Sequence, residues 1–477
     1  MPDLPSFDFA VIGGGSGGYA AARTAASLGL STAVIDGADE LGGLCILRGC
    51  MPSKTLIESA NRNRIATDAA AFGLDVQVAP PRIATIRERK RRLIADFASY
   101  RQQQLEDGRF VLYRGHAEFL DPHHLNIVPR DGSDSFTLHA RTFCVATGST
   151  EFVPPIPGLA DTGFWTSDTI LDTDTLPQSF VVLGGGAIAL EMAHYLEGIG
   201  RQVSIVQRSR QFLTGMDPSV SQVIETASQQ RGIHAYLGTQ IHRVENTAEG
   251  KKRIHFDHQH SATHVEGDEI LLAMGRRPAT DSLNAHRAHL GLAAGKLHIS
   301  PTQQTTQPHI FAAGDVCSPL DVVHLAIQQG EIAARNAHRL LTGSSQPLEE
   351  MDYRLRLFGV FCHPQVAGVG ATRAQLDHAG TPYLSASYPF DDHGKSMVMG
   401  ETHGFVEMLA HRDSGEILGA TCVGPEATEL IHEVVIAMHH HTTVEDFALI
   451  PHYHPTLSEI WTYPAEDLAD QRAAIQA

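Results

Sequence analysis

A glycine-rich turn between a strand and a helix occurs twice in the chain, and this repeat constrains the fold more than any other feature. In the first copy, an apolar strand pattern at 7–12 leads into Gly13, Gly15 and Gly18, and an alanine-rich helix then leads to a second strand that ends at Asp36. Gly13 permits a tight turn, and Gly15 lets the backbone approach a pyrophosphate at the N-terminus of the helix. This order of elements predicts a Rossmann-like unit that binds a dinucleotide.

The second copy starts with a strand pattern at 180–183 and continues through Gly184 and Gly186, with Ala189 in the place of the third glycine. Its second strand leads to Gln207, which lies 23 residues after the first glycine, the same separation as in the first copy. A single glycine triplet arises in ordinary turns, but two complete units with equal spacing indicate two dinucleotide sites. The repeat therefore predicts an α/β fold with two Rossmann-like domains.

The residues at the end of each second strand indicate different nucleotides. Asp36 can accept hydrogen bonds from both hydroxyl groups of an unphosphorylated adenosine ribose. At the second site, Gln207 is followed by Arg208 and Arg210, whose guanidinium groups can bind a 2′-phosphate that a carboxylate would repel. We therefore expect the second site to prefer NADP(H) over NAD(H); the alternative is that both arginines are ordinary surface residues.

Length and composition exclude several other classes of protein. A chain of 477 residues is too long for one hydrophobic core. A net charge of −18 argues against nucleic acid or an anionic membrane as a partner. No apolar run is long enough to cross a membrane, and the strand pattern from Phe7 leaves no room for a signal peptide. We therefore expect a cytoplasmic protein.

Two of the six cysteines lie close together in the segment GGLCILRGCMPSK, which covers 42–54. Four residues separate Cys45 from Cys50, whereas the other cysteines are single. No second Cys or His pair has the usual zinc spacing, so no metal site is expected, and a structural disulfide is unusual in the cytosol. A redox-active pair is the favoured interpretation. Gly49 and Pro52 predict an irregular helix, which can bring the two sulfurs within bonding distance.

The motifs of the chain, taken in order, resemble those of the FAD-dependent pyridine nucleotide–disulfide oxidoreductases, a family that includes dihydrolipoamide dehydrogenase, glutathione reductase and mercuric reductase. The resemblance covers nearly the whole chain. Besides the glycine motifs and the cysteine segment, it rests on ATG at 146–148, AMGRRP at 273–278, IFAAGDV at 310–316 and HPTLSE at 454–459.

The resemblance implies two Rossmann-like dinucleotide-binding domains, for FAD and NAD(P), and a C-terminal α+β dimerisation domain. It implies an FAD-binding domain at 1–150 that a central segment at 275–345 completes, an NAD(P)-binding domain at 151–274 and an interface domain at 346–477. FAD would occupy the first glycine motif and the nicotinamide nucleotide the second. The further residues that it implies for cofactor binding are Gly43, Thr147, Gly148, Gly275, Gly314 and Asp315.

The resemblance also implies roles in catalysis. Cys45 would be the interchange thiol that meets the substrate, and Cys50 the charge-transfer thiolate that lies against the flavin. Lys54 would lie near the flavin ring and pair with Glu191.

His454 would be the base, because an imidazole can accept and donate a proton near pH 7. In the family this histidine reaches across a homodimer to the cysteines of the other subunit, and Glu459 would orient its imidazole. A structural role for Glu459 stays open, because Thr456 and Glu459 also match a helix capping box with Thr456 as the N-cap.

We therefore predict a dihydrolipoamide dehydrogenase-like enzyme that passes electrons between NAD(P)(H), FAD, the cysteine pair and an external thiol or disulfide. That external partner would be a small molecule or a lipoylated carrier protein. The alternatives are an NADPH-dependent reductase of a low-molecular-weight disulfide, similar to glutathione reductase, and a thiol-independent flavin transhydrogenase or redox sensor.

The chain departs from the family pattern around the thiols. Leu44, Leu47 and Arg48 replace the usual residues there, and the charge of Arg48 can favour a thiolate. Cys362 lies in Cys-His-Pro where relatives usually have Thr-Asp-Pro, and we expect it to be a buried, inert thiol.

Overall fold

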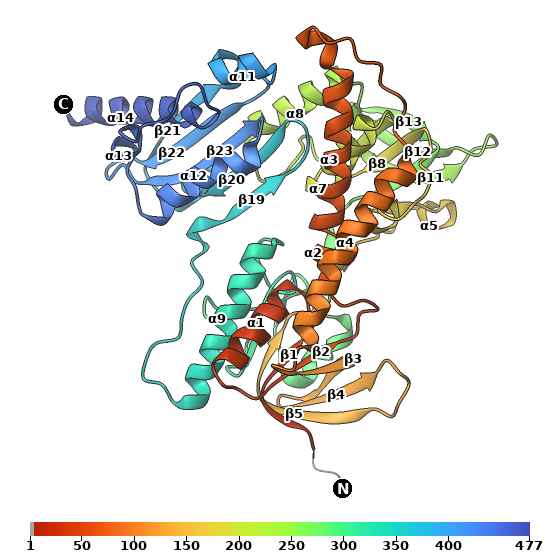
Figure 1. The fold of residues 1–477 in the computed structure, drawn as a ribbon, viewed down its shortest axis with the longest axis vertical. Helices are drawn as coiled ribbons and strands as arrows, with labels where there is room; N and C mark the ends of the chain where they lie inside the picture. The colour runs from red at the N-terminus through yellow and green to blue at the C-terminus, as the bar shows by residue number, and fades with distance from the viewer. Residues whose placement is uncertain (1–3) are drawn as a thin grey trace. The chain divides into compact units, whose positions relative to one another are not determined.

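The computed structural model describes residues 4–477, which form two compact units (Figure 1). Unit 1 contains the residues up to Ser53 together with 88–152 and 275–352, and unit 2 contains 54–87, 153–274 and 353–477. Two of the boundaries, after Phe152 and after Met274, lie at or next to the ends of the segment expected to bind NAD(P). The assignment of domains to cofactors stays a prediction.

Unit 1 is built on a mainly parallel sheet. Its strands are β1 (Ser6–Ile12), β2 (Thr32–Asp36), β3 (Val111–Asp121), β4 (His124–Pro129), β5 (Phe136–Val145) and β18 (Ile310–Ala312). The parallel strands lie in the order β3-β2-β1-β5-β18, and β4 pairs antiparallel with β3 and β5. This is the strand order of a Rossmann-like unit, as the first glycine motif predicted.

Both faces of this sheet are buried, which is why its central strand is apolar at nearly every position. Phe9 and Val11 of β1 face one core, and Ala10 and Ile12 face the other. Helices α1 (Ser16–Ser27) and α9 (Val323–Thr342) pack side by side on the first of these cores (Figure 1).

Unit 2 contains a second parallel sheet, in the order β10-β9-β8-β14-β7. Its strands are β7 (Trp165–Thr166), β8 (Ser179–Leu183), β9 (Gln202–Gln207), β10 (His234–Leu237) and β14 (Glu269–Leu272). Helix α7 (Ala187–Gly198) follows β8, and α8 (Pro218–Gln230) follows β9. The N–H of Ser219 donates to Asp217, which caps α8. A separate antiparallel sheet consists of β11 (Gln240–Asn246), β12 (Lys252–His258) and β13 (Ser261–Gly267).

The C-terminal part of unit 2 is an antiparallel sheet in the order β19-β20-β23-β22-β21. Its strands are β19 (Leu357–Val360), β20 (Gln365–Gly370), β21 (Tyr383–Pro389), β22 (Phe405–His411) and β23 (Ile417–Gly424). Helices α12 (Ala427–His439) and α14 (Thr462–Gln476) cover one face of this sheet, where Val406 and Met408 pack with the fully buried Trp461 (Figure 1). The predicted α+β character of this segment is confirmed. Within residues 4–477, no helix is long and apolar enough to span a bilayer.

Candidate cofactor and active site

Both glycine turns fold back against the end of a neighbouring strand. Gly13 has φ +103°, and a Cβ there would lie 2.4 Å from the carbonyl oxygen of Ala146, which follows β5. Gly184 has φ +123°, and a Cβ there would lie 2.3 Å from the carbonyl oxygen of Ala273, which follows β14. The ATG and AMG segments therefore form equivalent walls of the two turns, which explains why each accompanies a glycine motif.

The two turns have the space and the donors that a pyrophosphate requires. A Cβ on Gly186 would meet open space, and a Cβ on Gly15 would meet only the Cα of Gly43, at 3.9 Å. Gly15 and Gly186 precede α1 and α7, and neither helix start is capped by a side chain, so backbone N–H groups point toward this space. The residues of both turns therefore fit a dinucleotide.

Asp36 and Gln207 take equivalent positions under the two turns. Asp36 is buried, and its two carboxylate oxygens accept hydrogen bonds from the N–H groups of Gly14 and Ala38, at 2.7 and 2.8 Å. A Cβ on Gly185 would lie 2.9 Å from Cδ of Gln207, so this side chain reaches under its turn as Asp36 does. A neutral amide thus replaces a carboxylate at the second site.

Arg208 and Arg210 follow β9, and both are exposed. Neither guanidinium forms an ion pair with another residue in the described range 4–477. The alkyl part of Arg210 packs near Gly238, where a Cβ would lie 3.1 Å from its Cγ. Both charges are therefore available to an anion at the end of β9.

The remaining residues predicted to bind FAD lie together in unit 1. The carboxylate of Asp315 accepts a hydrogen bond from the Ser149 hydroxyl at 2.6 Å, and Arg276 donates to the same hydroxyl at 2.8 Å. The N–H of Gly314 donates to Gln329 at 2.8 Å. These contacts hold Asp315 immediately after β18, at the carboxyl edge of the sheet where ligands of such folds bind.

Thr147, Gly148 and Gly275 line the same edge. The Thr147 hydroxyl donates to the carbonyl of Ala279 at 2.8 Å. Gly148 and Gly275 have φ +71° and +115°, and a Cβ on either would meet open space. They therefore leave room beside the backbone rather than filling it.

The two neighbouring cysteines lie on a tight helical turn. Cys45 belongs to α2 (Gly43–Leu47), and Cys50 is the first residue of α3 (Cys50–Thr67), so the helix is interrupted between the thiols as predicted. A Cβ on Gly49 would lie 3.0 Å from the carbonyl oxygen of Leu44 and 3.2 Å from Cα of Cys45. The absence of a side chain at Gly49 therefore lets α3 start close against α2. Cys45 and Cys50 are partly buried, whereas the four other cysteines are buried.

Gly43 joins this turn to the first glycine motif. A Cβ on Gly43 would lie 2.6 Å from Cα of Gly15, so the start of α2 packs directly against the start of α1. The start of the helix that carries Cys45 therefore lies next to the space that a dinucleotide pyrophosphate fits.

Arg101 of α4 (Ile83–Glu106) also belongs to this region. Nothing in the sequence indicates a role for it, because it is one of many arginines in that helix. Its guanidinium lies 4.1 Å from the ring centroid of Tyr19. Burial lowers the pKa of Arg101, and interactions with Tyr19 and with the Cys45 thiol oppose this shift. A positive charge near a cysteine favours its thiolate. Arg48, which was expected to supply such a charge, has an exposed side chain.

Lys54 and Glu191 are in direct contact. The ammonium group of Lys54 donates to the two carboxylate oxygens of Glu191 at 2.7 and 2.9 Å. Glu191 also accepts a hydrogen bond from the N–H of Phe361 at 3.0 Å, and the Phe361 ring centroid lies 4.8 Å from the ammonium nitrogen of Lys54. Cys362, the next residue, is buried as expected, and burial raises the pKa of its thiol.

His454 and Glu459 also form a pair. Nδ1 of His454 lies 3.0 and 3.2 Å from the carboxylate oxygens of Glu459. The imidazole is 78% exposed, whereas the carboxylate is 9% exposed. A buried carboxylate therefore orients an imidazole that projects from the surface.

The capping box predicted at Thr456 is wrong. The segment Ser458–Trp461 is a 3₁₀ helix, its N-cap is Leu457, and no side chain caps it. The Glu459 carboxylate points to His454 instead of to the backbone of Thr456. Burial of Ile460 and Trp461 sets the start of this helix, which local capping signals do not reveal.

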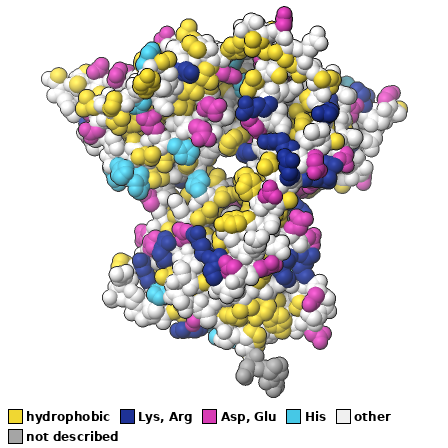
Figure 2. Space-filling model, viewed as in Figure 1, with side chains coloured by type: hydrophobic (Ala, Val, Ile, Leu, Met, Phe, Trp, Pro, Cys, Tyr) yellow, Lys and Arg dark blue, Asp and Glu magenta, His cyan; other side chains and the backbone are white. Residues whose placement is uncertain are grey.

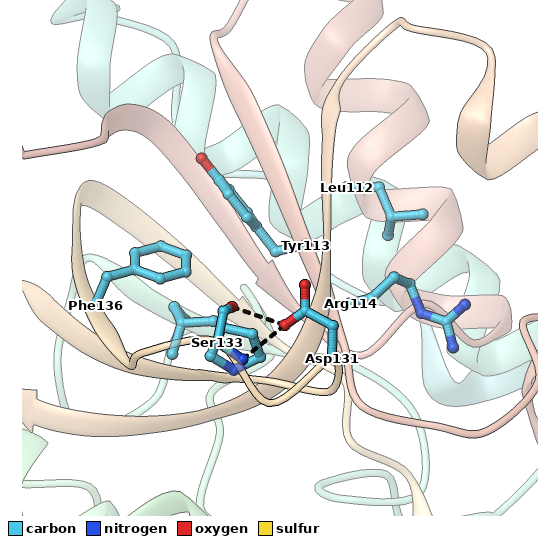
Figure 3. Close-up of a pocket in the computed structure, with 8 residues that line it drawn as sticks. Leu112, Tyr113, Arg114, Asp131, Ser133 and Phe136 are labelled. Atoms are coloured by element: carbon cyan, nitrogen blue, oxygen red, sulfur yellow. Dashed lines mark hydrogen bonds between the residues drawn. The ribbon is translucent and has the colours of Figure 1, made fainter.

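A cavity of about 270 Å³ lies elsewhere in unit 1, on β3, β4 and β5 (Figure 3). Tyr113 and Phe136 line it, and Asp131 accepts two hydrogen bonds from Ser133 at its rim. The guanidinium of Arg114 points away from it and donates to the carbonyl of Ala38 (Figure 3). None of the residues predicted for catalysis or cofactor binding lines this cavity. Among residues 4–477, no group of three or more His, Cys, Asp or Glu side chains is arranged to hold a metal ion.

Comparison with known proteins gives a consistent result. Residues 7–330 match the family described as pyridine nucleotide-disulphide oxidoreductase, and residues 358–465 match the dimerisation domain of the same family. The chain is 30% identical to the dihydrolipoyl dehydrogenase of Chlamydia muridarum, over 96% of both proteins. It is 31% identical to the dihydrolipoyl dehydrogenase of Haloferax volcanii, over 97% of this chain and 96% of that protein.

Two solved structures have the same fold as this chain. LpdA from Mycobacterium tuberculosis superposes with a TM-score of 0.85 at 26% identity, over 98% of this chain and all of that one. The Cu(II) complex of RclA, a HOCl-induced flavoprotein disulfide reductase from Escherichia coli, superposes with a TM-score of 0.82 at 25% identity, over 99% of this chain and all of that one.

Proposed function

The chain belongs to the pyridine nucleotide–disulphide oxidoreductases, and from this premise we propose that it catalyses dithiol–disulfide exchange in the manner of dihydrolipoamide dehydrogenase. The observation that carries the proposal is the turn between α2 and α3, where Gly49 lets Cys50 start a helix directly against Cys45. Two relatives that are 30–31% identical over nearly their full length are dihydrolipoyl dehydrogenases, which favours this activity over the thiol-independent alternatives.

The proposed reaction is an exchange between the cysteine pair and an external dithiol. A thiolate of the substrate attacks the sulfur of Cys45, and Cys50 leaves as a thiolate. The second sulfur of the substrate then displaces Cys45, so the substrate becomes a disulfide and the enzyme pair becomes a dithiol. Two electrons pass to the enzyme, and the protons released go to a base.

We assign the role of that base to His454. The pair with Glu459 holds the imidazole with Nδ1 toward the carboxylate, which leaves Nε2 to exchange protons with the thiols. The chain carries a dimerisation domain, and we propose that it forms a homodimer in which His454 of the partner subunit serves Cys45 and Cys50. Leu449 and Tyr453, near His454 in the sequence, are each 83% exposed and suit such an interface.

The cofactors are assigned from the fit of the two glycine turns. FAD, held by the first turn with Asp36 and Asp315, and a nicotinamide nucleotide, held by the second turn, supply the electron transfer beyond the thiols when they are bound. Lys54 would place its positive charge near the flavin, and Glu191 holds this side chain in position.

We further propose that the nucleotide is NADP(H), although the dihydrolipoyl dehydrogenases of this family typically use NAD(H). Gln207 carries no charge, and Arg208 and Arg210 are exposed at the end of β9. Replacing both arginines with alanine should lower kcat/KM for NADPH by about a hundredfold or more, since charge-assisted hydrogen bonds contribute roughly 1.5–3 kcal/mol each. The value for NADH should change little, and equal losses with both nucleotides would contradict the preference.

The central experiment replaces the thiols. Cys45→Ser and Cys50→Ser should each abolish oxidation of dihydrolipoamide, while FAD stays bound and transfer from NADPH to an artificial acceptor continues. Assays with lipoamide and glutathione disulfide in parallel identify the substrate class. Wild-type turnover of dihydrolipoamide by the double variant would contradict the proposal. The cysteine usage of the chain also leads us to propose a cytoplasmic location.

A further inference from the structure

A second histidine lies behind the His454–Glu459 pair. His393 follows a short 3₁₀ helix, Phe390–Asp392, and precedes α11 (Gly394–Met399). Its side chain is 0% exposed, and its Nε2 lies 3.4 Å from a carboxylate oxygen of Glu459. The Glu459 carboxylate thus lies between an exposed and a fully buried imidazole.

The surroundings of His393 favour one of its two neutral tautomers. Nδ1 lies 2.8 Å from the hydroxyl of Ser396, which can donate to it. Nε2 has no hydrogen-bond partner among the described residues, but it lies 3.4 Å from a carboxylate oxygen of Glu459, whose negative charge favours a proton there. Burial lowers the pKa of His393, and the interaction with Glu459 opposes this shift. A neutral His393 with its proton on Nε2 accepts from the Ser396 hydroxyl at Nδ1 and directs its N–H toward the Glu459 carboxylate.

From this geometry we propose that His393 is a positioning residue whose Nε2–H, directed at the Glu459 carboxylate from 3.4 Å, weakens the attraction of that carboxylate for His454 and thereby sets the proton affinity of His454. The proposal rests on the proposed function, in which His454 is the base. The positive end of an N–H dipole on one side of a carboxylate weakens the attraction of that carboxylate for a proton on its other partner. Without that donor, Glu459 would stabilise the protonated form of His454 more strongly.

The other groups near His393 do not compete for this role. The ring of Tyr463 meets that of His393 edge-on at 6.4 Å and stacks on Tyr388 at 4.0 Å. The Tyr388 hydroxyl donates to Asp392 at 2.9 Å, so the charge of Asp392 is bound to a phenol. The titratable or charged groups that face His393 are therefore Glu459, His454, Tyr463 and, behind the tyrosine stack, Tyr388 and Asp392.

The test compares His393→Leu, which keeps bulk without a donor, with His393→Gln, whose amide N–H can replace Nε2–H. The readout is the pH profile of kcat/KM for dihydrolipoamide, which rises with pH as the base loses its proton. In the leucine variant the midpoint of this rise should move to higher pH by at least about half a unit. In the glutamine variant the midpoint should lie close to that of the wild type. Transfer from NADPH to an artificial acceptor should remain as in the wild type.

A matched control is His194→Leu. His194 is also buried; its Nδ1–H donates to the Leu190 carbonyl at 2.8 Å, and its Nε2 lies 3.3 Å from the Ser228 hydroxyl, both in unit 2. This variant should lose stability without moving the pH profile.

Two outcomes separate the two proposals. A wild-type enzyme without dithiol turnover would contradict the proposed function and this assignment with it. A wild-type enzyme that turns over, together with a leucine variant whose profile does not move, would overturn the role of His393 alone. A melting temperature that falls in the leucine variant without a shifted profile counts as this second outcome.

Discussion

At the scale of the residue, Glu191 and Glu459 share one arrangement, in which a buried carboxylate binds a more exposed side chain. Each carboxylate is less than one-tenth exposed, and each binds a more exposed cationic or titratable side chain, Lys54 or His454. A buried carboxylate is costly unless hydrogen bonds satisfy its oxygens. Each buried carboxylate is therefore held in one orientation. It fixes in turn the orientation of Lys54 or His454, which has to meet a cofactor or substrate.

The contribution of Glu191 to stability can be measured. We expect Glu191→Ala to lower the free energy of unfolding of the flavin-free protein by about 2–3 kcal/mol, because Lys54 and the N–H of Phe361 lose their acceptor. Urea unfolding followed by far-UV circular dichroism checks the value. The control is Glu58→Ala, which removes an exposed ion pair with Arg62 on the same helix and should cost less than about 0.5 kcal/mol. Equal losses in the two variants would contradict the assigned role.

At the scale of the element, the glycines within each nucleotide-binding turn are needed for different structural reasons. The first glycine of each turn avoids a clash with the neighbouring strand end, and the third position of the GGG segment leaves open space. Substitutions at these two positions should therefore fail for different reasons.

We expect Gly186→Ala to fold normally and to bind the nicotinamide nucleotide at least about tenfold more weakly, because the new methyl group occupies the open space at the start of α7. Gly184→Ala should instead destabilise unit 2, since it forces a positive φ on alanine and brings Cβ to 2.3 Å from a carbonyl oxygen. Nucleotide titration by calorimetry and thermal melting distinguish the two effects. Normal binding by the Gly186 variant would show that the pyrophosphate lies elsewhere.

For the whole molecule, the proposed site needs residues of two chains. On the visible face of the C-terminal part of unit 2, hydrophobic side chains lie among uncharged atoms and a few acidic and histidine side chains (Figure 2). Large exposed apolar side chains there include Ile436, Leu449 and Tyr453. Such exposure is typical of a surface that another protein covers.

A mixing experiment tests whether the site is shared. Cys45→Ser and His454→Ala homodimers should each be inactive with dihydrolipoamide. After subunits are exchanged, half of the dimers are mixed, and each mixed dimer regains one intact site of two, so about a quarter of the wild-type activity should return. If His454 served the thiols of its own chain, the mixture would stay inactive. Sedimentation of differently tagged subunits confirms that exchange has occurred.

Local signals in the sequence were sufficient to predict much of the fold of this protein. The strand, glycine turn and helix order predicted both parallel sheets, because such turns impose backbone conformations that few other residues adopt. Gly49 and Pro52 predicted, for the same local reason, that the helix is irregular between Cys45 and Cys50. Resemblance to a family then named the Lys54–Glu191 and His454–Glu459 pairs before their contacts were known.

Only the tertiary structure decided what lies next to these segments. It placed Arg101 near Cys45, Phe361 on Glu191 and His393 behind Glu459, and these contacts join residues far apart in the chain. It also replaced the expected capping box at Thr456, since burial of Trp461 outweighs a single local hydrogen bond. Backbone geometry is encoded over a few residues, whereas the electrostatic surroundings of a thiol or an imidazole depend on which distant side chains packing brings to it.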